Sequence, residues 1–221
     1  MPIIESLLST TKEIWEAYNK HPFVLGIQDG SLDREKFKHY IIQDYLYLEE
    51  YIKVFAIGIA KAESLEMKKL FSRYVNILIE GEMDIHRGYM GKFEISQQEI
   101  HSASRSLDNL SYTSYMIRVA YEGGEAEILA AILSCAYSYE VIAQNILKNN
   151  PDASYHPFYG DWIRGYTDAQ YSKENKRLIH TLDKLTQHYT TQQIQHLIEI
   201  FTFCSRYELA FWDLAWNMKK F

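Results

Sequence analysis

The chain has 221 residues, of which 47% are hydrophobic and 24% charged, the balance of a soluble globular protein and not of a disordered or collagen-like one. Its formal net charge of −6 provides no basic surface for nucleic acid or anionic lipid. Only 10 Gly and 4 Pro are present, which argues against a β-sandwich or barrel, because these folds need many tight turns.

Apolar residues recur at helical spacing along most of the chain. This period predicts helices over 3–20, 33–62, 65–93, 110–122, 124–149, 171–188 and 190–219, with short helical turns near 22–29 and 157–167. Asp33 precedes the second helix and is placed to cap it, since its side-chain oxygen can accept from first-turn amides. No Pro-, Gly- or Ser-rich linker interrupts the pattern. We therefore expect an all-α helical bundle that forms a single domain over residues 1–221.

Three features of the chain bear on its compartment. The first residues carry no basic segment and are typical of an amphipathic helix, so no secretory signal is expected. The most apolar stretch, 128–146, is interrupted by polar residues, so no membrane span is expected. Two cysteines, Cys135 and Cys204, are too few for a disulfide framework, which favours a reducing cytoplasm.

Three apolar helix faces each contain a carboxylate at their centre. The faces are Phe37, Tyr40, Asp44, Tyr47, Leu48 and Tyr51; Phe201, Cys204, Glu208, Phe211, Trp212 and Ala215; and Phe71, Val75, Leu78, Glu82, Ile85 and Tyr89. Burying a carboxylate costs several kcal/mol unless it is paired, hydrogen-bonded or protonated. Any one of these acids could simply bond a Tyr or Arg and stabilise packing. Together the three predict a polar pocket inside a helical core.

Cys135 is a candidate nucleophile. It lies four residues before Tyr139, so the thiol and the phenol share one helix face. A lone cysteine is usually a small buried apolar residue, and we assign that role to Cys204. A thiol becomes reactive only when a neighbour stabilises the thiolate and moves protons, and Glu208 is available for this.

Signatures of metal and nucleotide sites are missing from the sequence. None of the eight histidines has an acidic residue three positions before it, which excludes the di-iron bundle motif. His-Glu-x-x-His, Cys-x-x-Cys, the P-loop and Gly-x-Ser-x-Gly are also absent. Glu82 and His86 stand four residues apart and could hold a metal, but a local hydrogen bond between them is the preferred interpretation.

Several blocks recur here in the order of a known family. They are His21-Pro22-Phe23-Val24, Asp29-Gly30-Ser31-Leu32, the run from Phe37 to Leu48, Cys135-x-x-x-Tyr139, His156-Pro157 with Trp162-Ile163 and Tyr166, and the run from Tyr207 to Asp213. With these blocks, which span nearly the whole chain, the sequence resembles the TenA family, also called thiaminase II or aminopyrimidine aminohydrolase. The block around Asp44 and the block around Glu208, flanking Cys135, are specific in combination.

The resemblance implies a heme-oxygenase-like bundle, usually a homotetramer, that works in the cytoplasm. It implies the conversion of 4-amino-5-aminomethyl-2-methylpyrimidine to the 5-hydroxymethyl compound and ammonia, which salvages the pyrimidine half of degraded thiamine. Cleavage of thiamine itself into pyrimidine and thiazole would be a slower activity. No metal or organic cofactor is needed, and neither nucleic acid nor a membrane is expected as a partner.

The resemblance also assigns a role to single residues. It makes Cys135 the nucleophile that adds to the ring, Glu208 the acid/base, and Asp44 the carboxylate that binds the ring nitrogen and the exocyclic amine. Hydrogen-bonding phenols would be Tyr112, Tyr139 and Tyr166, and aromatic walls would be Tyr47 and Phe211. Ser134 departs from the family pattern, which often has Pro before the nucleophile.

Two other classes of function remain open at this point. One is a non-catalytic pyrimidine-binding or regulatory protein on the same fold, which would bind pyrimidine without releasing ammonia. The other is a heme- or quinone-related enzyme, which for heme would need an axial histidine. The acidic balance and the lack of a basic helix-turn-helix segment argue against direct DNA contact.

Overall fold

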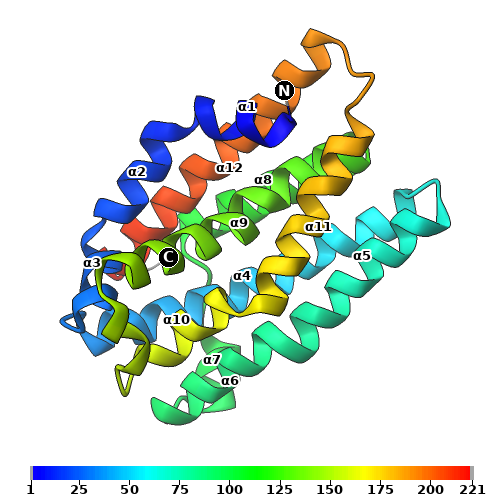
Figure 1. Cartoon of the computed structure of the whole chain (residues 1–221). Helices are drawn as coiled ribbons and strands as arrows, with labels where there is room; N and C mark the ends of the chain where they lie inside the picture. Colours follow the sequence, from blue (N-terminus) through cyan, green and yellow to red (C-terminus); the bar gives the residue numbers. More distant parts are fainter. Residues whose placement is uncertain (1, 220–221) are drawn as a thin grey trace. The chain divides into compact units, whose positions relative to one another are not determined.

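The computed structural model describes residues 2–219, except for the side chains at positions 82, 84 and 97. Within these residues the chain forms helices and no strand (Figure 1). The helices are α1 (Ile3–Thr10), α2 (Lys12–Lys20), α3 (Pro22–Asp29), α4 (Arg34–Lys61), α5 (Leu65–Ile77), η1 (Leu78–Glu82), α6 (Met83–Lys92), α7 (Gln97–Ser102), α8 (Leu107–Glu122), α9 (Glu125–Asn149), η2 (Pro151–Tyr155), α10 (Gly160–Thr167), α11 (Ala169–Leu185) and α12 (Thr191–Asn217). The all-α prediction is therefore confirmed.

The chain divides into two compact units, each built from separate stretches of sequence. The described residues up to Leu32 and the stretch Leu129–Trp212 form the first unit. Asp33–Ile128 and the described residues after Trp212 form the second unit. One boundary falls between α3 and α4, one inside α9 and one inside α12. The expectation of a single domain stays a prediction.

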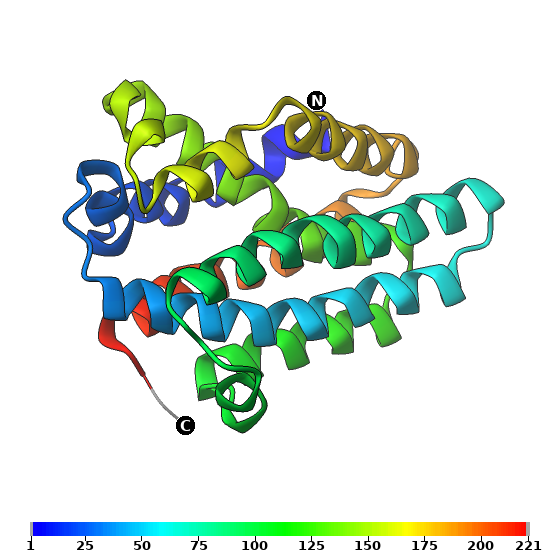
Figure 2. The ribbon, with the colours of Figure 1, turned by 90° about the horizontal axis from the view of Figure 1, so that it is seen from below.

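In the second unit, α4 is the central helix. It packs against α5, α6, η1 and α8, and Figure 2 shows it running alongside α5 and α8. The apolar face predicted on this helix is buried throughout, including Asp44 at its centre. In the first unit, α2 contacts α3, and α11 contacts both α1 and α10.

Helix α9 supplies the most apolar core segment. Six consecutive residues, from Ile128 to Leu133, have no solvent exposure. Among the described helices, α9 is the one whose length and composition would allow it to cross a membrane. However, 78% of its most apolar window is buried inside the protein, which is the pattern of a core helix.

Two helices begin at the residues that the sequence indicates. Asp33 caps α4, because its Oδ1 accepts from the Glu35 amide at 2.7 Å. The break predicted at His21-Pro22 is the start of α3, where Pro22 takes the first helical position. There the His21 ring accepts from the amide of Phe23 at 3.2 Å.

Some element boundaries differ from the prediction. The expected helix over 3–20 breaks at Thr11, whose hydroxyl donates to the Leu7 carbonyl at 2.9 Å and competes with the backbone. Helix α7 was not predicted, although Ser96 and Glu99 have the spacing of a capping box. Ser96 Oγ accepts from the Glu99 amide at 3.1 Å, so this signal was present in the sequence.

The expected helix over 65–93 is interrupted by the π-helical turn η1, which contains Gly81. A π turn inserts one residue, so the positions that follow it move to a new face. The buried positions are Phe71, Tyr74, Leu78, Met83, His86 and Tyr89, with a step of five residues across the turn. The predicted face through Val75 and Ile85 is therefore wrong, since both are only half-buried. The side chain of Glu82 lies outside the described residues.

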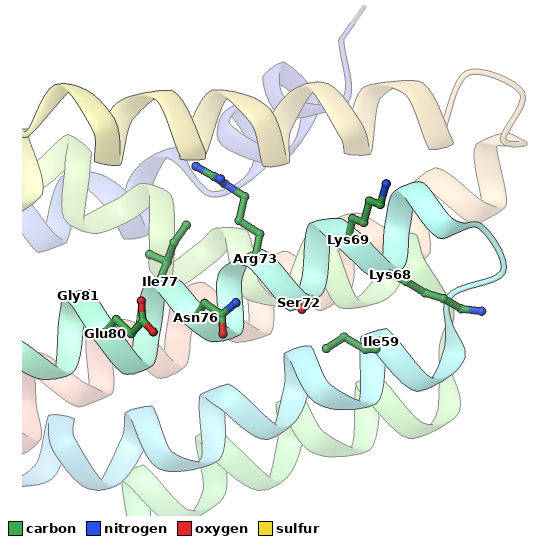
Figure 3. A pocket seen from close by; sticks show the side chains of 9 residues that line it. All are labelled: Ile59, Lys68, Lys69, Ser72, Arg73, Asn76, Ile77, Glu80 and Gly81. Carbon is green, nitrogen blue, oxygen red and sulfur yellow. The ribbon is translucent and has the colours of Figure 1, made fainter.

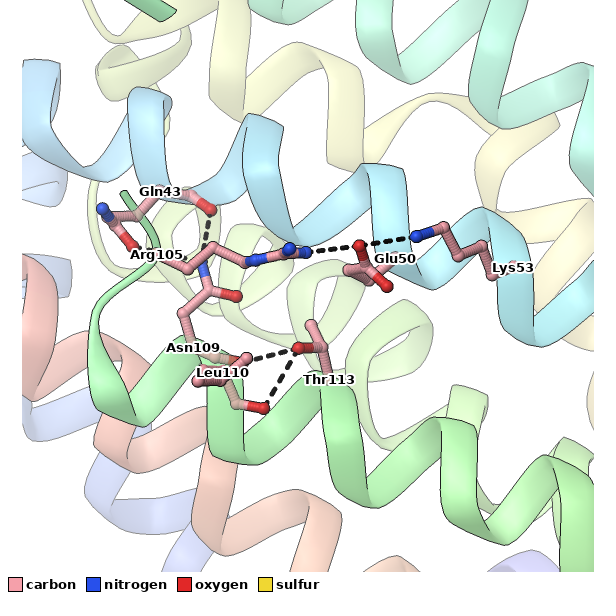
Figure 4. A network of polar contacts seen from close by, with 7 residues as sticks. All are labelled: Gln43, Glu50, Lys53, Arg105, Asn109, Leu110 and Thr113. Atoms are coloured by element: carbon pink, nitrogen blue, oxygen red, sulfur yellow. Dashed lines mark hydrogen bonds and ion pairs between the residues drawn. The ribbon is translucent and has the colours of Figure 1, made fainter. Parts of the chain in front are cut away.

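Polar contacts fasten α4 to the segment that leads into α8 (Figure 4). Gln43 Nε2 donates to the Ser104 carbonyl at 2.9 Å, and Gln43 Oε1 accepts from the Ser106 amide at 3.0 Å. Asn109 Nδ2 donates to the Gln43 carbonyl at 2.7 Å. Because Gln43 precedes Asp44, these bonds hold the backbone that carries the buried acid.

A second fastening point lies two turns further along α4, at Glu50. Its Oε1 lies 2.5 Å from Arg105 Nη1 and 2.8 Å from Lys53 Nζ (Figure 4). Burial alone would raise the pKa of Glu50, but the hydrogen bonds and charges of Lys53 and Arg105 outweigh burial and lower it. The ionised form of Glu50 therefore stabilises the folded state.

We expect Glu50→Gln to lower the free energy of unfolding at pH 7 by about 1 kcal/mol, because water screens a partly exposed ion pair. The lowered pKa makes this stabilisation complete above the unfolded-state value of about 4.3, and it is lost as the pH falls through the folded-state pKa. Urea unfolding should show that the difference in the free energy of unfolding between wild type and variant shrinks as the pH is lowered from 7. Glu49→Gln, an exposed neighbour, is the control. An equal loss at all pH values would contradict the assignment.

Candidate functional site

Every residue predicted for the site is buried. The eight side chains are at most 8% exposed: Asp44, Tyr47, Tyr112, Cys135, Tyr139, Tyr166, Glu208 and Phe211. Five of them belong to the first unit and three, Asp44, Tyr47 and Tyr112, to the second. Each group is described within its own unit.

In the first unit, Glu208 and Cys135 both affect the pKa of the Tyr18 phenol on α2. Burial is the main reason that the pKa of Tyr18 is raised well above its usual value, and the charge of Glu208 is the next. Cys204 and Cys135 add smaller electrostatic effects in the same direction. Cys135 from α9 and Glu208 from α12 therefore lie close enough to one hydroxyl to influence its ionisation.

Helix α2 holds the turn of α12 that leads to Glu208. The Tyr18 hydroxyl donates to the Ser205 carbonyl at 2.6 Å, and Trp15 Nε1 donates to Ser205 Oγ at 3.1 Å. Ser205 lies three residues before Glu208, which is nearly one helical turn. Two bonds from one helix thus position the backbone that carries the acid. Sequence reasoning missed Trp15 and Tyr18, because neither matches a motif.

Cys204 has the environment of a packing residue. It is fully buried, and burial is the main cause that raises the pKa of its thiol, with the charge of Glu208 acting in the same direction. A hydrogen bond with Ser134 acts the other way but does not offset burial. The thiol of Cys204 is therefore held in its neutral form, which is unreactive.

Ser134, where the family often has Pro, fits inside an unbroken helix. Its hydroxyl donates to the Ala131 carbonyl at 3.0 Å, within α9. One turn on, Ser138 Oγ donates to the carbonyl of Cys135 at 3.0 Å. The backbone on both sides of Cys135 therefore carries hydroxyl bonds of a kind that often bends helices.

Helix α11 braces the same turn of α9. The Ala136 carbonyl accepts from the Tyr171 hydroxyl at 2.9 Å and from Asn175 Nδ2 at 3.0 Å. Asn175 also donates to the buried Glu140 carboxylate at 2.7 Å. These contacts fix the backbone of the residue that directly follows Cys135.

An aromatic cluster surrounds Tyr139, one turn beyond Cys135. Its ring centroid lies 4.8 Å from that of Tyr166, 5.3 Å from that of Trp212 and 5.9 Å from that of Trp162. The structure thus brings together two of the predicted phenols, Tyr139 and Tyr166. The two tryptophans complete the cluster. Sequence reasoning placed Trp212 on the apolar face with Glu208, and Trp162 only within a family block. Flat apolar walls of this kind suit a flat heteroaromatic ligand.

In the second unit, Asp44 pairs with His86. The His86 Nε2 atom lies 2.7 Å from Asp44 Oδ2, and both side chains are buried. In the His86 tautomer that carries its proton on Nε2, this atom donates to the Asp44 carboxylate. The predicted partner of His86 was Glu82, whose side chain lies outside the described residues. The contact with Asp44 could not be seen in the sequence, because it joins α4 to α6.

The rings of the other two predicted residues of this unit lie next to each other at a tilt. The ring centroids of Tyr47 and Tyr112 are 5.2 Å apart, and the Tyr47 hydroxyl donates to the sulfur of Met116 at 3.7 Å. Tyr47 also stacks on Tyr51 with a centroid distance of 5.3 Å. This unit therefore places two predicted aromatic residues beside each other and Asp44 beside a hydrogen-bond donor.

Two surface hollows of the second unit contain none of the predicted site residues. An open groove of about 840 Å³ is lined by residues of α4, α5 and η1, with Lys68, Lys69 and Arg73 projecting from α5 (Figure 3). A pocket of about 480 Å³ is lined in part by Tyr45, Glu49 and Arg87. Neither hollow combines a thiol with an acid.

Histidine, cysteine and carboxylate side chains do not gather in threes anywhere in the part of the chain whose side chains are described. The candidate chemistry in the first unit is therefore that of a thiol, a carboxyl group and phenols. In the second unit it is that of a carboxylate supported by an imidazole. These are groups for binding the polar edge of a small ring and for moving protons.

Comparison with known proteins identifies close relatives. The chain is 44% identical to an aminopyrimidine aminohydrolase of Helicobacter pylori, over 98% of this chain and 100% of the relative. It is 40% identical to the aminopyrimidine aminohydrolase of Halalkalibacterium halodurans, covering 98% and 96% of the two chains. For the protein of that name in Bacillus subtilis the identity is 34%, with coverage of 98% and 91%.

Solved structures agree with this relationship. A TenA homologue from P. horikoshii OT3 superimposes with a TM-score of 0.88 at 28% identity, covering 98% of this chain and 99% of that one. A Shewanella denitrificans protein described as having a heme oxygenase-like fold gives a TM-score of 0.77 at 12% identity, covering 97% and 92%. The predicted fold is thereby confirmed. A model of the TENA/THI-4/PQQC family matches residues 8–218, and the chain belongs to that family.

Proposed function

We propose that this protein is an aminopyrimidine aminohydrolase of thiamine salvage. It would convert 4-amino-5-aminomethyl-2-methylpyrimidine and water to the 5-hydroxymethyl pyrimidine and ammonia. The observation that carries the proposal is the burial of Cys135 on α9 and of Glu208 on α12 within one unit, and both act to raise the pKa of the buried Tyr18 hydroxyl. The names of relatives that match nearly the whole chain support the same reaction.

In the proposed reaction, Cys135 is the nucleophile and Glu208 moves the protons. The sulfur adds to the pyrimidine ring, and the thiol proton passes to the ring. Glu208, as the carboxylate, takes that proton from the ring, and the electron pair moves outward and breaks the exocyclic carbon–nitrogen bond. Glu208 protonates the departing amine, which leaves as ammonia.

Water completes the exchange. It adds to the exocyclic carbon, and Glu208 takes its proton, so that the acid is restored. Glu208 returns this proton to the ring, the carbon–sulfur bond breaks, the ring becomes aromatic again, and the ring proton passes to the sulfur of Cys135. One carbon–nitrogen bond has been replaced by one carbon–oxygen bond, and no electrons are gained or lost overall.

The remaining predicted residues would bind and orient the substrate. Asp44 would accept from the exocyclic 4-amino group and from the adjacent ring nitrogen in its protonated form. Tyr47 and Phe211 would lie against the ring faces, and Tyr112, Tyr139 and Tyr166 would supply hydroxyl groups around the thiol and ring. The burial of all six side chains supports a water-poor site, in which such polar contacts are strong.

Thiamine is proposed as a second substrate, cleaved at the same exocyclic carbon with the thiazole as the leaving group. We also propose that the protein acts as a homotetramer in the cytoplasm, where both free thiols stay reduced. Assaying ammonia release from the aminomethyl pyrimidine beside thiazole release from thiamine would rank the two substrates.

We expect Cys135→Ala to lower kcat/KM for ammonia release by at least about 10³-fold, because a nucleophile cannot be replaced by water at a comparable rate. Cys204→Ala, which removes the other buried thiol, is the matched control and should retain activity. Circular dichroism would verify that both variants are folded. Wild-type turnover by folded Cys135→Ala would reject covalent catalysis.

Glu208→Gln should lower kcat by about 10²–10⁴-fold, the usual contribution of a positioned acid/base. The amide keeps the size of the side chain but can neither give nor take a proton. Glu199→Gln, an exposed substitution on the same helix, is the control. The proposal fails if Glu208→Gln turns over at the wild-type rate. It also fails if the wild-type protein binds the pyrimidine in calorimetry but releases no ammonia.

A further inference from the structure

The environment of His86 points to a function beyond packing. It is 2% exposed, and its Nε2 atom lies 2.7 Å from Oδ2 of Asp44, which is 3% exposed. A buried carboxylate keeps its charge only with a partner, and a buried imidazole likewise needs one for its N–H. The contact joins α4 to α6, so it fixes the Asp44 side chain from outside its own helix.

The π turn η1 is what brings His86 to this position. An uninterrupted α-helix from α5 onward would continue the buried face from Leu78 to Glu82 and Ile85. The extra residue of the turn moves the buried positions to Met83 and His86 instead. A π turn interrupts the regular hydrogen-bond pattern of the α-helix, and such turns are frequent at functional sites.

The backbone on the other side of the pair is equally constrained. Gln43, next to Asp44, is held by Ser104, Ser106 and Asn109 through bonds of 2.7–3.0 Å. Asp44 is thus fixed through its backbone by the Gln43 contacts and through Oδ2 by His86.

We propose that His86 is a positioning residue for substrate recognition, which holds the Asp44 carboxylate in the orientation that accepts the amino edge of the pyrimidine. This inference rests on the proposed function, in which Asp44 binds that edge. His86 touches Asp44 and not the reacting atoms, so its loss should weaken substrate binding more than it slows the chemical steps. The N–H at Nε2 is the group that matters.

Two substitutions of similar polarity separate this role from packing. The amide nitrogen of Gln reaches about as far as Nε2 of His, whereas that of Asn stops near the Nδ1 position. We expect His86→Asn to raise KM for the aminomethyl pyrimidine by about 10–100-fold, the usual effect of removing a supporting hydrogen bond behind a binding group. The change in kcat should be smaller, and His86→Gln should recover most of the lost affinity.

The same substitutions in an Asp44→Asn background complete the test. If His86 acts through Asp44, His86→Asn adds little to the KM of Asp44→Asn, so the two effects are not additive. Additive effects, or equal KM values for His86→Asn and His86→Gln in folded proteins, would overturn the inference. The proposed function fails separately, if wild-type protein releases no ammonia or if Asp44→Asn alone leaves KM unchanged.

Discussion

The structure depends on three carboxylates that lie wholly or partly buried among its helices and that each have a partner from a different element. Asp44 on α4 meets His86 on α6, Glu50 meets Arg105 before α8, and Glu140 on α9 meets Asn175 on α11. Because an unpaired buried carboxylate costs several kcal/mol, each of these contacts also fixes how two elements of one unit pack. Polar groups that would weaken an ordinary core therefore determine the arrangement of this one.

The same principle explains how the proposed nucleophile and the proposed acid/base are positioned. Cys135 and Glu208 lie on long helices whose neighbouring carbonyls are bound from outside, by Tyr171 and Asn175 at Ala136 and by Tyr18 at Ser205. A bond to a helix carbonyl next to a functional residue limits sliding and rotation of that turn. Precise placement of a side chain therefore comes from contacts made by its neighbours in sequence.

Much of the fold could be predicted from periodicity, and the failures have identifiable physical causes. Buried faces on α4 and α12 follow the 3.6-residue period, and Asp33 caps α4 as its type and place indicate. The period fails at η1, since a single inserted residue changes the face of everything after it. The residues of the site could be named from family blocks, but their supports could not. His86, Tyr18 and Ser205 have partners far away in sequence, and one sequence contains no signal for such pairs.

The π turn links the position of His86 to the proposed recognition of the pyrimidine by Asp44. A regular helix would have turned His86 away from the buried face, and Asp44 would then lack the donor found at 2.7 Å. An amidine-like pyrimidine edge presents a donor beside a ring nitrogen, and a carboxylate matches it only in one plane. An imidazole donor behind the carboxylate restricts that plane without adding charge when the ring is neutral. The π turn between α5 and α6 thus places a partner beside Asp44. Without it, the Asp44 side chain on the regular helix α4 would rotate more freely.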